Sequence, residues 1–190
     1  MASWSKVKQQ LESFLCPELI GTVEYRASSY RYVSDKAGQC YMAVNKKEIF
    51  SMNDMKFGIR WYQNEQEIIK DPEFRIFISE EEVQTYMEKP EFKNVPVDRI
   101  PNIIRKRRVS EVAKKIMESQ ANLAKSDFFS VANTFLTSSV DSSLNSDDIM
   151  LNILAIVDRR IGKNRLKKMK SNIELKHPVV QYFYNLRCGS

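Results

Sequence analysis

The apolar residues of the first fifty positions follow a helical spacing and then a strand spacing. Over residues 4–15 they recur every three or four positions, which predicts a helix that Pro17 ends. Apolar and polar residues then alternate over 22–27, 40–44 and 48–52. Three closely spaced strands joined by short turns predict an antiparallel meander.

Two local features interrupt this meander. The apolar parity switches after Ala27 to Tyr30, which predicts a β-bulge near Ser28 and Ser29. Residues 34–38, with the sequence Ser-Asp-Lys-Ala-Gly, have the composition of a turn.

Residues 55–89 return to helical spacing, with one exception. A helical stripe over 55–69 ends before Pro72, and residues 74–78 (Phe-Arg-Ile-Phe-Ile) predict a short fourth strand. Ser79, with Glu82 three positions later, predicts the capped start of a short helix that stops at Pro90.

Beyond a proline-containing connection over 90–101, every apolar pattern is helical. The predicted helices cover 109–124, start at Ser126, start at the acidic cap of 146–148, and start at Pro178. Residues 149–157 are apolar nearly all round, so this helix is expected to be central and buried. Gly162 stands where a helix C′ residue is expected.

These elements define an α+β fold, with an N-terminal helix and a small antiparallel sheet followed by a mostly helical C-terminal half. We expect residues 1–98 and 99–190 to pack together as a single domain. The 190-residue chain is long enough for a sizeable core, and its composition is that of an ordinary globular protein.

Charge divides the chain unevenly. Residues 1–98 carry 13 Lys and Arg against 16 Asp and Glu, whereas residues 99–190 carry 17 against 8. The second half therefore has a net charge of +9 and the first half of −3. Positive charge of this kind attracts a polyanion, or it lies on the solvated outside of helices.

The cations of the second half fall into two clusters. The first choice for an anion or partner contact is Arg159, Arg160, Lys163 and Arg165, because arginine binds phosphate or carboxylate in a bidentate manner. The second choice is Arg105, Arg107 and Arg108. The competing interpretations are structural. Cations at a helix C-terminus complement the helix dipole and pair with Asp158, and Glu111 with Lys115 forms the i,i+4 pattern of a solvated face.

Other chemistry has less support in the sequence. Tyr25, Tyr30, Tyr32 and Tyr41 on the predicted sheet could stack nucleic-acid bases, but such tyrosines more often face the core. His177 precedes Pro178 and is more often a capping or surface residue than a base. No phosphate-binding glycine loop, catalytic motif or metal-ligand spacing occurs, so no cofactor and no metal are expected.

Three features of the sequence predict the cellular compartment of the protein. The N-terminus has no apolar signal segment, and no window is long and apolar enough for a membrane span. Cys16, Cys40 and Cys188 are odd in number and widely spaced, which fits reduced thiols in a cytoplasm.

Several short motifs occur in order along the chain. They are Trp4-Ser5-Lys6, Gly21-x-Val23-Glu24-Tyr25, Tyr30-Arg31-Tyr32, Lys47-Glu48-Ile49, Asp158-Arg159-Arg160-Ile161-Gly162-Lys163 and His177-Pro178-Val179. This order resembles a family of uncharacterised bacterial proteins, over roughly residues 4–187. The resemblance implies a bacterial cytosolic protein without an assigned activity, and it supplies no catalytic residues.

The sequence favours a non-enzymatic cytosolic module that contacts an acidic partner, nucleic acid or protein, through its basic helical half. Two alternatives stay open. The acidic first half could instead dock against the basic second half, within one chain or between two. An enzyme acting on an anionic small molecule would need a pocket between sheet and helices, with a carboxylate such as Glu24 or Glu48 as base.

Overall fold

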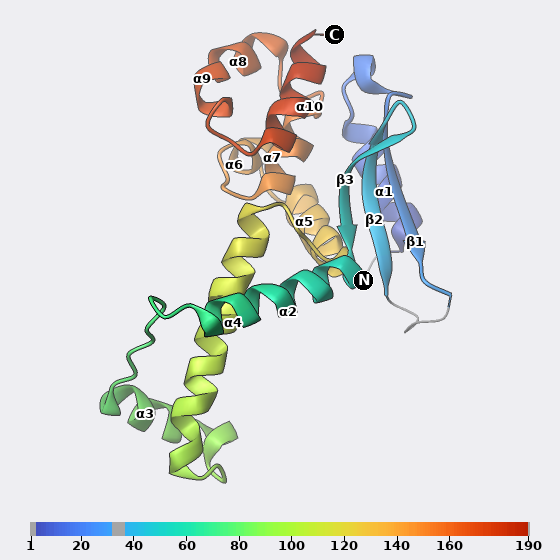
Figure 1. Ribbon diagram of the computed structural model, residues 1–190. Helices are drawn as coiled ribbons and strands as arrows, with labels where there is room; N and C mark the ends of the chain where they lie inside the picture. Colours follow the sequence, from blue (N-terminus) through green and yellow to red (C-terminus); the bar gives the residue numbers. More distant parts are fainter. Residues whose placement is uncertain (1–2, 32–36, 190) are drawn as a thin grey trace. The chain divides into compact units, whose positions relative to one another are not determined.

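The computed structural model describes residues 3–31 and 37–189 of the chain (Figure 1). It confirms the α+β fold, with a helix, a three-stranded antiparallel sheet and a mostly helical second half. The described residues form two compact units. The larger unit comprises the chain up to Phe57 and from Glu118 onward, and the smaller unit comprises Gly58–Met117.

The sheet of the larger unit is the predicted meander. Helix α1 (Trp4–Phe14) precedes strands β1 (Val23–Ser29), β2 (Gly38–Val44) and β3 (Lys47–Asn53), which lie in the order β1-β2-β3. All neighbouring strands are antiparallel. One sheet face is apolar and packs against α1 and α5 (Lys125–Thr137), because alternate residues of a strand point to opposite faces.

The predicted bulge at Ser28 and Ser29 is wrong. β1 and β2 pair without a shift up to Ser29, and the register shift lies instead between Met42 and Ala43, opposite β3. The parity switch that suggested the bulge marks the end of β1. Of the predicted turn, residues 34–36 lie outside the described residues.

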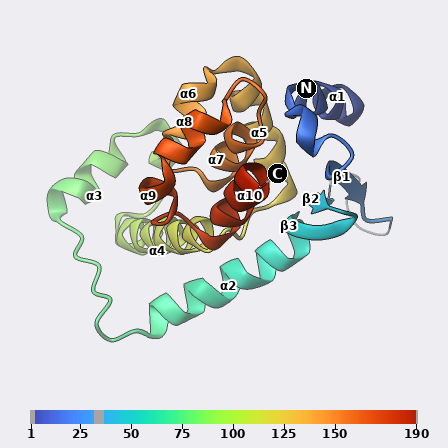
Figure 2. The ribbon, with the colours of Figure 1, turned by 90° about the horizontal axis from the view of Figure 1, so that it is seen from above.

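Helix α7 (Ile149–Ile156) is the centre of the helical part of the larger unit. Figure 2 shows it among α5, α6 (Val140–Leu144) and α10 (Pro178–Gly189), all of which contact it. Six of its eight residues are buried, as its apolar sequence predicts. Its one buried polar side chain, Asn152, donates hydrogen bonds to the carbonyls of Ser143 and Ser146 at 3.0 and 2.8 Å.

Several helix ends differ from those predicted. Helix α4 (Ile100–Ser119) stops before Ala121, whose φ of 55° is incompatible with a continuing helix. Helix α5 is capped at Ala124, not at Ser126, because the Asp127 carboxylate accepts the Ala124 N–H at 2.8 Å. Gly162 is not a C′ residue: its φ is −73°, and it precedes α8 (Lys163–Lys168), which leads to α9 (Lys170–Ile173).

The smaller unit contains most of α2 (Asp54–Lys70), then α3 (Glu80–Met87) and most of α4. Short 3-10 turns at Pro90–Phe92 and Val97–Arg99 occupy the connection before α4. Ser79 caps α3, since its hydroxyl accepts the Glu82 N–H at 3.2 Å. The core of this unit is formed by Ile68, Val109 and Ala113, with Phe74, Ile76, Val112 and Ile116 packed around them.

The predicted fourth strand at 74–78 is wrong. Within the described part of the chain, these residues pair with no strand. Their alternating apolar side chains pack instead against α2 and α4. A strand requires a hydrogen-bonded neighbour, and the local sequence cannot supply one.

Among the helices that the structure describes, none is both long and apolar enough to cross a membrane.

Candidate anion-binding surface

The first basic cluster begins where α7 ends. After Ile156 the chain runs beside the end of α1, where the Cys16 N–H donates to the Val157 carbonyl at 2.9 Å and the Arg159 N–H donates to the Phe14 carbonyl at 2.8 Å. These two bonds hold the backbone around Asp158 against α1. The same segment then leads through Gly162 into α8.

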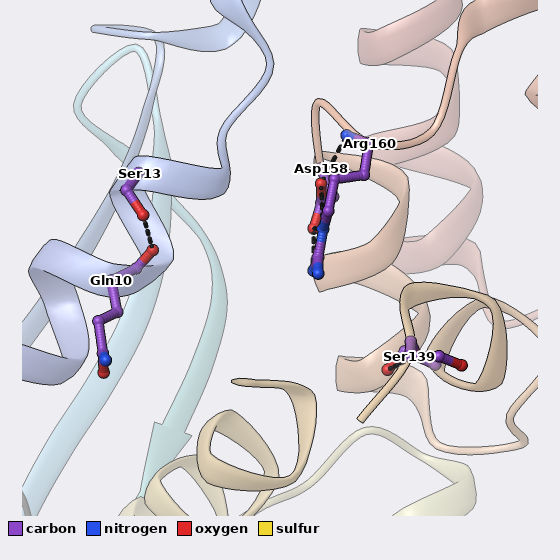
Figure 3. A network of polar contacts seen from close by, with 6 residues as sticks. Gln10, Ser13, Ser139, Asp158 and Arg160 are labelled. Atoms are coloured by element: carbon purple, nitrogen blue, oxygen red, sulfur yellow. Dashed lines mark hydrogen bonds and ion pairs between the residues drawn. The ribbon is translucent and has the colours of Figure 1, made fainter. Parts of the chain in front are cut away.

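Asp158 and Arg160 form an ion pair at this junction (Figure 3). The Asp158 side chain is fully buried. Its carboxylate accepts the Arg160 backbone N–H at 2.7 Å, Nε at 2.9 Å and Nη2 at 2.6 Å. One arginine thus supplies three donors to a buried charge.

The Arg160 guanidinium is also stacked on aromatic rings. Its central carbon lies 4.0 Å from the ring centroid of Phe14 and 5.6 Å from that of Phe135. Cation–π contacts of this kind add stability beyond the ion pair. The structure therefore gives Arg160 a clear structural task, as the cation that neutralises Asp158.

Two further cations of the predicted site have acidic partners. Lys163 Nζ lies 3.8 Å from the Glu18 carboxylate, and Arg165 Nη1 lies 2.6 Å from that of Asp141. Glu18 also receives Nη1 of Arg187 at 3.1 Å. The backbone N–H of Glu18, together with the charge of Arg187, lowers the pKa of the Glu18 carboxyl below its ordinary value.

Three exposed cations of this region remain to be described: Arg159, which belongs to the predicted site, and Lys167 and Lys168, which do not. Among the described residues none of the three has an ion-pair partner. Lys170 lies 3.9 Å from Glu174, and both of these side chains are largely in water. We call Arg159, Lys167, Lys168 and Lys170 the α8–α9 basic surface.

The position of this surface follows from the buried side of α8. Leu166 is fully buried, and two residues along an α-helix turn the side chain by about 200°, which places Lys168 nearly opposite it. This helical spacing could have identified Lys168 from the sequence. Glu18 and Asp141, the ion-pair partners of Lys163 and Arg165, are too distant in sequence for this pairing to be predicted.

The second basic cluster is not one surface. Arg105 to Arg108 are consecutive in α4, and consecutive helical residues point about 100° apart. Arg108 donates to the Phe77 carbonyl and to the Glu82 carboxylate, both at 2.6 Å. The Arg107 guanidinium lies over the rings of Phe92 and Tyr86, at 5.0 and 5.5 Å from their centroids.

Arg105 borders open space. It lines two adjoining depressions of the smaller unit, of about 770 and 620 Å³, together with Ile69 and Val109, and Arg107 also lines the larger of the two. The smaller unit as a whole carries 12 Lys and Arg against 11 Asp and Glu, and the larger unit 18 against 13. The larger unit thus carries +5 of the chain's net charge of +6.

The remaining candidates have structural surroundings. Tyr25 is fully buried, and burial, followed by the charge of Asp158, raises the pKa of its hydroxyl. His177 Nδ1 accepts the Val179 N–H at 3.1 Å, which makes it a cap of α10. The Glu24 carboxylate accepts Nε of its neighbour Arg26 at 2.9 Å. Glu48 is exposed.

The two buried cysteines lie in surroundings that favour the neutral thiol. Cys16 and Cys40 are fully buried, and burial raises the pKa of both thiols, that of Cys40 to about 12. In the part of the chain that the structure describes, no three His, Cys, Asp or Glu side chains are grouped so that they could hold a metal ion.

Fold and site together define an α+β protein in whose larger unit the exposed cations Arg159, Lys167 and Lys168 lie before and within α8. The chain belongs to the SF0329 protein family, an uncharacterised family whose model matches residues 3–188. This membership confirms the resemblance seen in the sequence motifs. No curated protein and no solved structure matches the chain significantly.

Proposed function

We propose that this protein is a non-enzymatic cytosolic binding module that contacts a nucleic-acid backbone through the α8–α9 basic surface. The observation that carries the proposal is the charge of residues 159–176, which include eight Lys and Arg and a single acidic residue, Glu174. Arg159, Lys167 and Lys168 add exposed cations that are not neutralised by another described side chain.

The depressions that the structure describes do not include residues of α8 or α9, and this favours a nucleic acid over an acidic protein as the partner. Protein interfaces have an apolar centre, whereas phosphate contacts need only exposed cations. Neither described depression of the smaller unit includes residues of α8 or α9, and the depression of the larger unit, about 380 Å³, is lined by Glu118, Asp127, Asp147 and Asp148. An acidic protein remains the alternative partner.

Fluorescence anisotropy with labelled single- and double-stranded oligonucleotides tests the proposal. If the three unpaired cations each contact one phosphate, a fourfold rise in salt should weaken binding about forty-fold. The variant Arg159→Glu/Lys167→Glu/Lys168→Glu should abolish binding. Arg160 is left unchanged, because its loss would strand the buried Asp158 carboxylate.

A matched control carries the same charge change elsewhere on the larger unit. Lys6, Lys46 and Lys47 are exposed, and none lies in α8 or α9. The variant Lys6→Glu/Lys46→Glu/Lys47→Glu should lose much less affinity than the α8–α9 variant. Equal losses would assign binding to net charge alone. Absence of oligonucleotide binding at low salt, together with binding of labelled polyglutamate, would replace the nucleic acid with an acidic protein.

A further inference from the structure

The segment between α2 and α3 has the sequence of a strand, but among the described residues no strand pairs with it. Residues 74–78 alternate in exposure: Phe74, Ile76 and Ile78 are half-buried, whereas Arg75 and Phe77 are exposed. This alternation is that of an extended chain with one face on the core. Figure 2 shows the segment running from the end of α2 to the start of α3.

The backbone of this segment retains hydrogen-bonding capacity. The N–H groups of Ile76, Phe77 and Ile78 donate to no other described residue, and the carbonyls of Ile76 and Ile78 accept from none. Only the Phe77 carbonyl is used, by Arg108. Unpaired backbone groups on a β-prone segment form a template on which another extended chain can add.

The space beside the segment is both apolar and basic. A depression of about 620 Å³ is lined by Ile68, Ile69, Phe74, Ile76, Phe77 and Val109, with Arg75 and Arg105 as its charged residues. It adjoins the depression of about 770 Å³, where Lys106 and Arg107 join Arg105 and the single acid is Glu65. The exposed aromatic Phe77, with 82% of its surface in water, lines the depression of about 620 Å³.

We propose that residues 74–78 form a docking site for an extended acidic peptide of a protein partner, which adds to the segment as a second strand. The free N–H and carbonyl groups of Ile76 and Ile78 would bind the peptide backbone. Alternate apolar side chains of the peptide would enter the depression, and its carboxylates would face Arg75 and Arg105. Charge complementarity favours this occupant over a second copy, because self-pairing would bring these arginines of two copies together.

The ligand side supplies the sharpest test. The full chain is titrated into a fluorescein-labelled nine-residue peptide of alternating glutamate and valine, and anisotropy is measured. Two further peptides have the same side chains but N-methyl groups on one or the other alternate set of backbone nitrogens, so each can form ladder bonds along one edge only. Methylation of the set that faces the segment should weaken binding at least tenfold, whereas methylation of the other set should leave the affinity of the plain peptide nearly unchanged. Equal affinities of all three peptides would overturn strand addition.

The protein side tests the charge contribution. Arg75→Glu/Arg105→Glu should weaken peptide binding at least tenfold, since both side chains are exposed at the depression. Lys93→Glu/Arg99→Glu is the matched control, with two exposed cations of the same unit that line neither depression. Equal effects of the two variants would overturn the docking site. Sedimentation that showed a dimer dissociated by Arg75→Glu would overturn the proposed occupant in favour of a second copy.

These experiments are independent of the proposed function. The α8–α9 variant changes only the larger unit and the peptide variants only the smaller unit. Either proposal can therefore fail while the other stands.

Discussion

Replacement of Arg160 by methionine should destabilise the larger unit strongly. Methionine keeps an unbranched apolar side chain, shorter than that of arginine, but removes every side-chain donor to Asp158. The Asp158 carboxylate, which is fully buried, would keep the backbone N–H of residue 160 at 2.7 Å and lose Nε and Nη2. A buried charge would then lack its counter-charge.

The magnitude follows from the burial of the two partners. Removing one member of a buried ion pair costs about 3–5 kcal/mol, because the remaining charge stays desolvated. The Arg160 side chain is 36% exposed, so water can reach part of the vacated space. We therefore expect about 3 kcal/mol, with about 0.5 kcal/mol more from the lost cation–π contact.

Urea unfolding measures this loss. The chain has two tryptophans, Trp4 in the larger unit and Trp61 in the smaller, so a Trp61→Phe background makes fluorescence report on the larger unit alone. With a denaturant dependence of about 2 kcal/mol per molar urea, the unfolding midpoint should fall by about 1.7 M.

Two comparisons show whether burial is the cause. Arg165→Met breaks an equally short ion pair, but its partner Asp141 is 55% exposed, so the loss should stay below about 1 kcal/mol. Adding Asp158→Asn to Arg160→Met should recover part of the stability, because it removes the stranded charge. Equal losses for the two arginine variants, or no recovery in the double variant, would refute the reasoning.

Three further predictions concern other parts of the chain. Gly38→Ala should destabilise the protein by about 1–3 kcal/mol in thermal unfolding, since a Cβ there would lie 2.0 Å from the Ser28 carbonyl oxygen. Gly58→Ala, inside α2, should stabilise it by up to about 1 kcal/mol, because a Cβ at this position would meet no atom within 4 Å. In the native protein a thiol reagent followed by mass spectrometry should modify Cys188 and spare the two buried thiols, and full modification of all three before denaturation would contradict this result. The pKa of the Glu18 carboxyl is lowered in the folded state, so its contribution to stability is complete above its ordinary pKa and is lost as the pH falls through the lowered value. The difference in unfolding free energy between wild type and Glu18→Gln should therefore be constant above about pH 6 and shrink below about pH 4. A pH-independent difference would contradict the assignment.

Much of the fold could be predicted because its signals are local. The apolar spacing of α1, the alternation of the three strands and the apolar sequence of α7 each depend on residues within a few positions of one another. Ser79 and Pro178 mark helix starts through bonds and ring geometry confined to one turn. Such features need no knowledge of distant neighbours.

The errors share a physical origin. Residues 74–78 have a strand sequence, but a strand exists only where another chain segment pairs with it, and the described fold provides none. The division of charge at residue 98 likewise does not coincide with the compact units, because α2 leaves the larger unit and α4 returns to it. Both outcomes depend on contacts between segments far apart in sequence.

The sequence by itself determined the fold class, the positions of α1, the three strands and α7, the resemblance to an uncharacterised family and the presence of an excess of cations after residue 158. Only the tertiary structure decided which of these cations are available. Arg160 is held by a buried carboxylate and two aromatic rings, and Lys163 and Arg165 meet Glu18 and Asp141, which lie 145 and 24 positions earlier. Folding brings distant charges together through the burial of the apolar core, and an ion pair between segments far apart in the chain has no sequence spacing that would reveal it in advance.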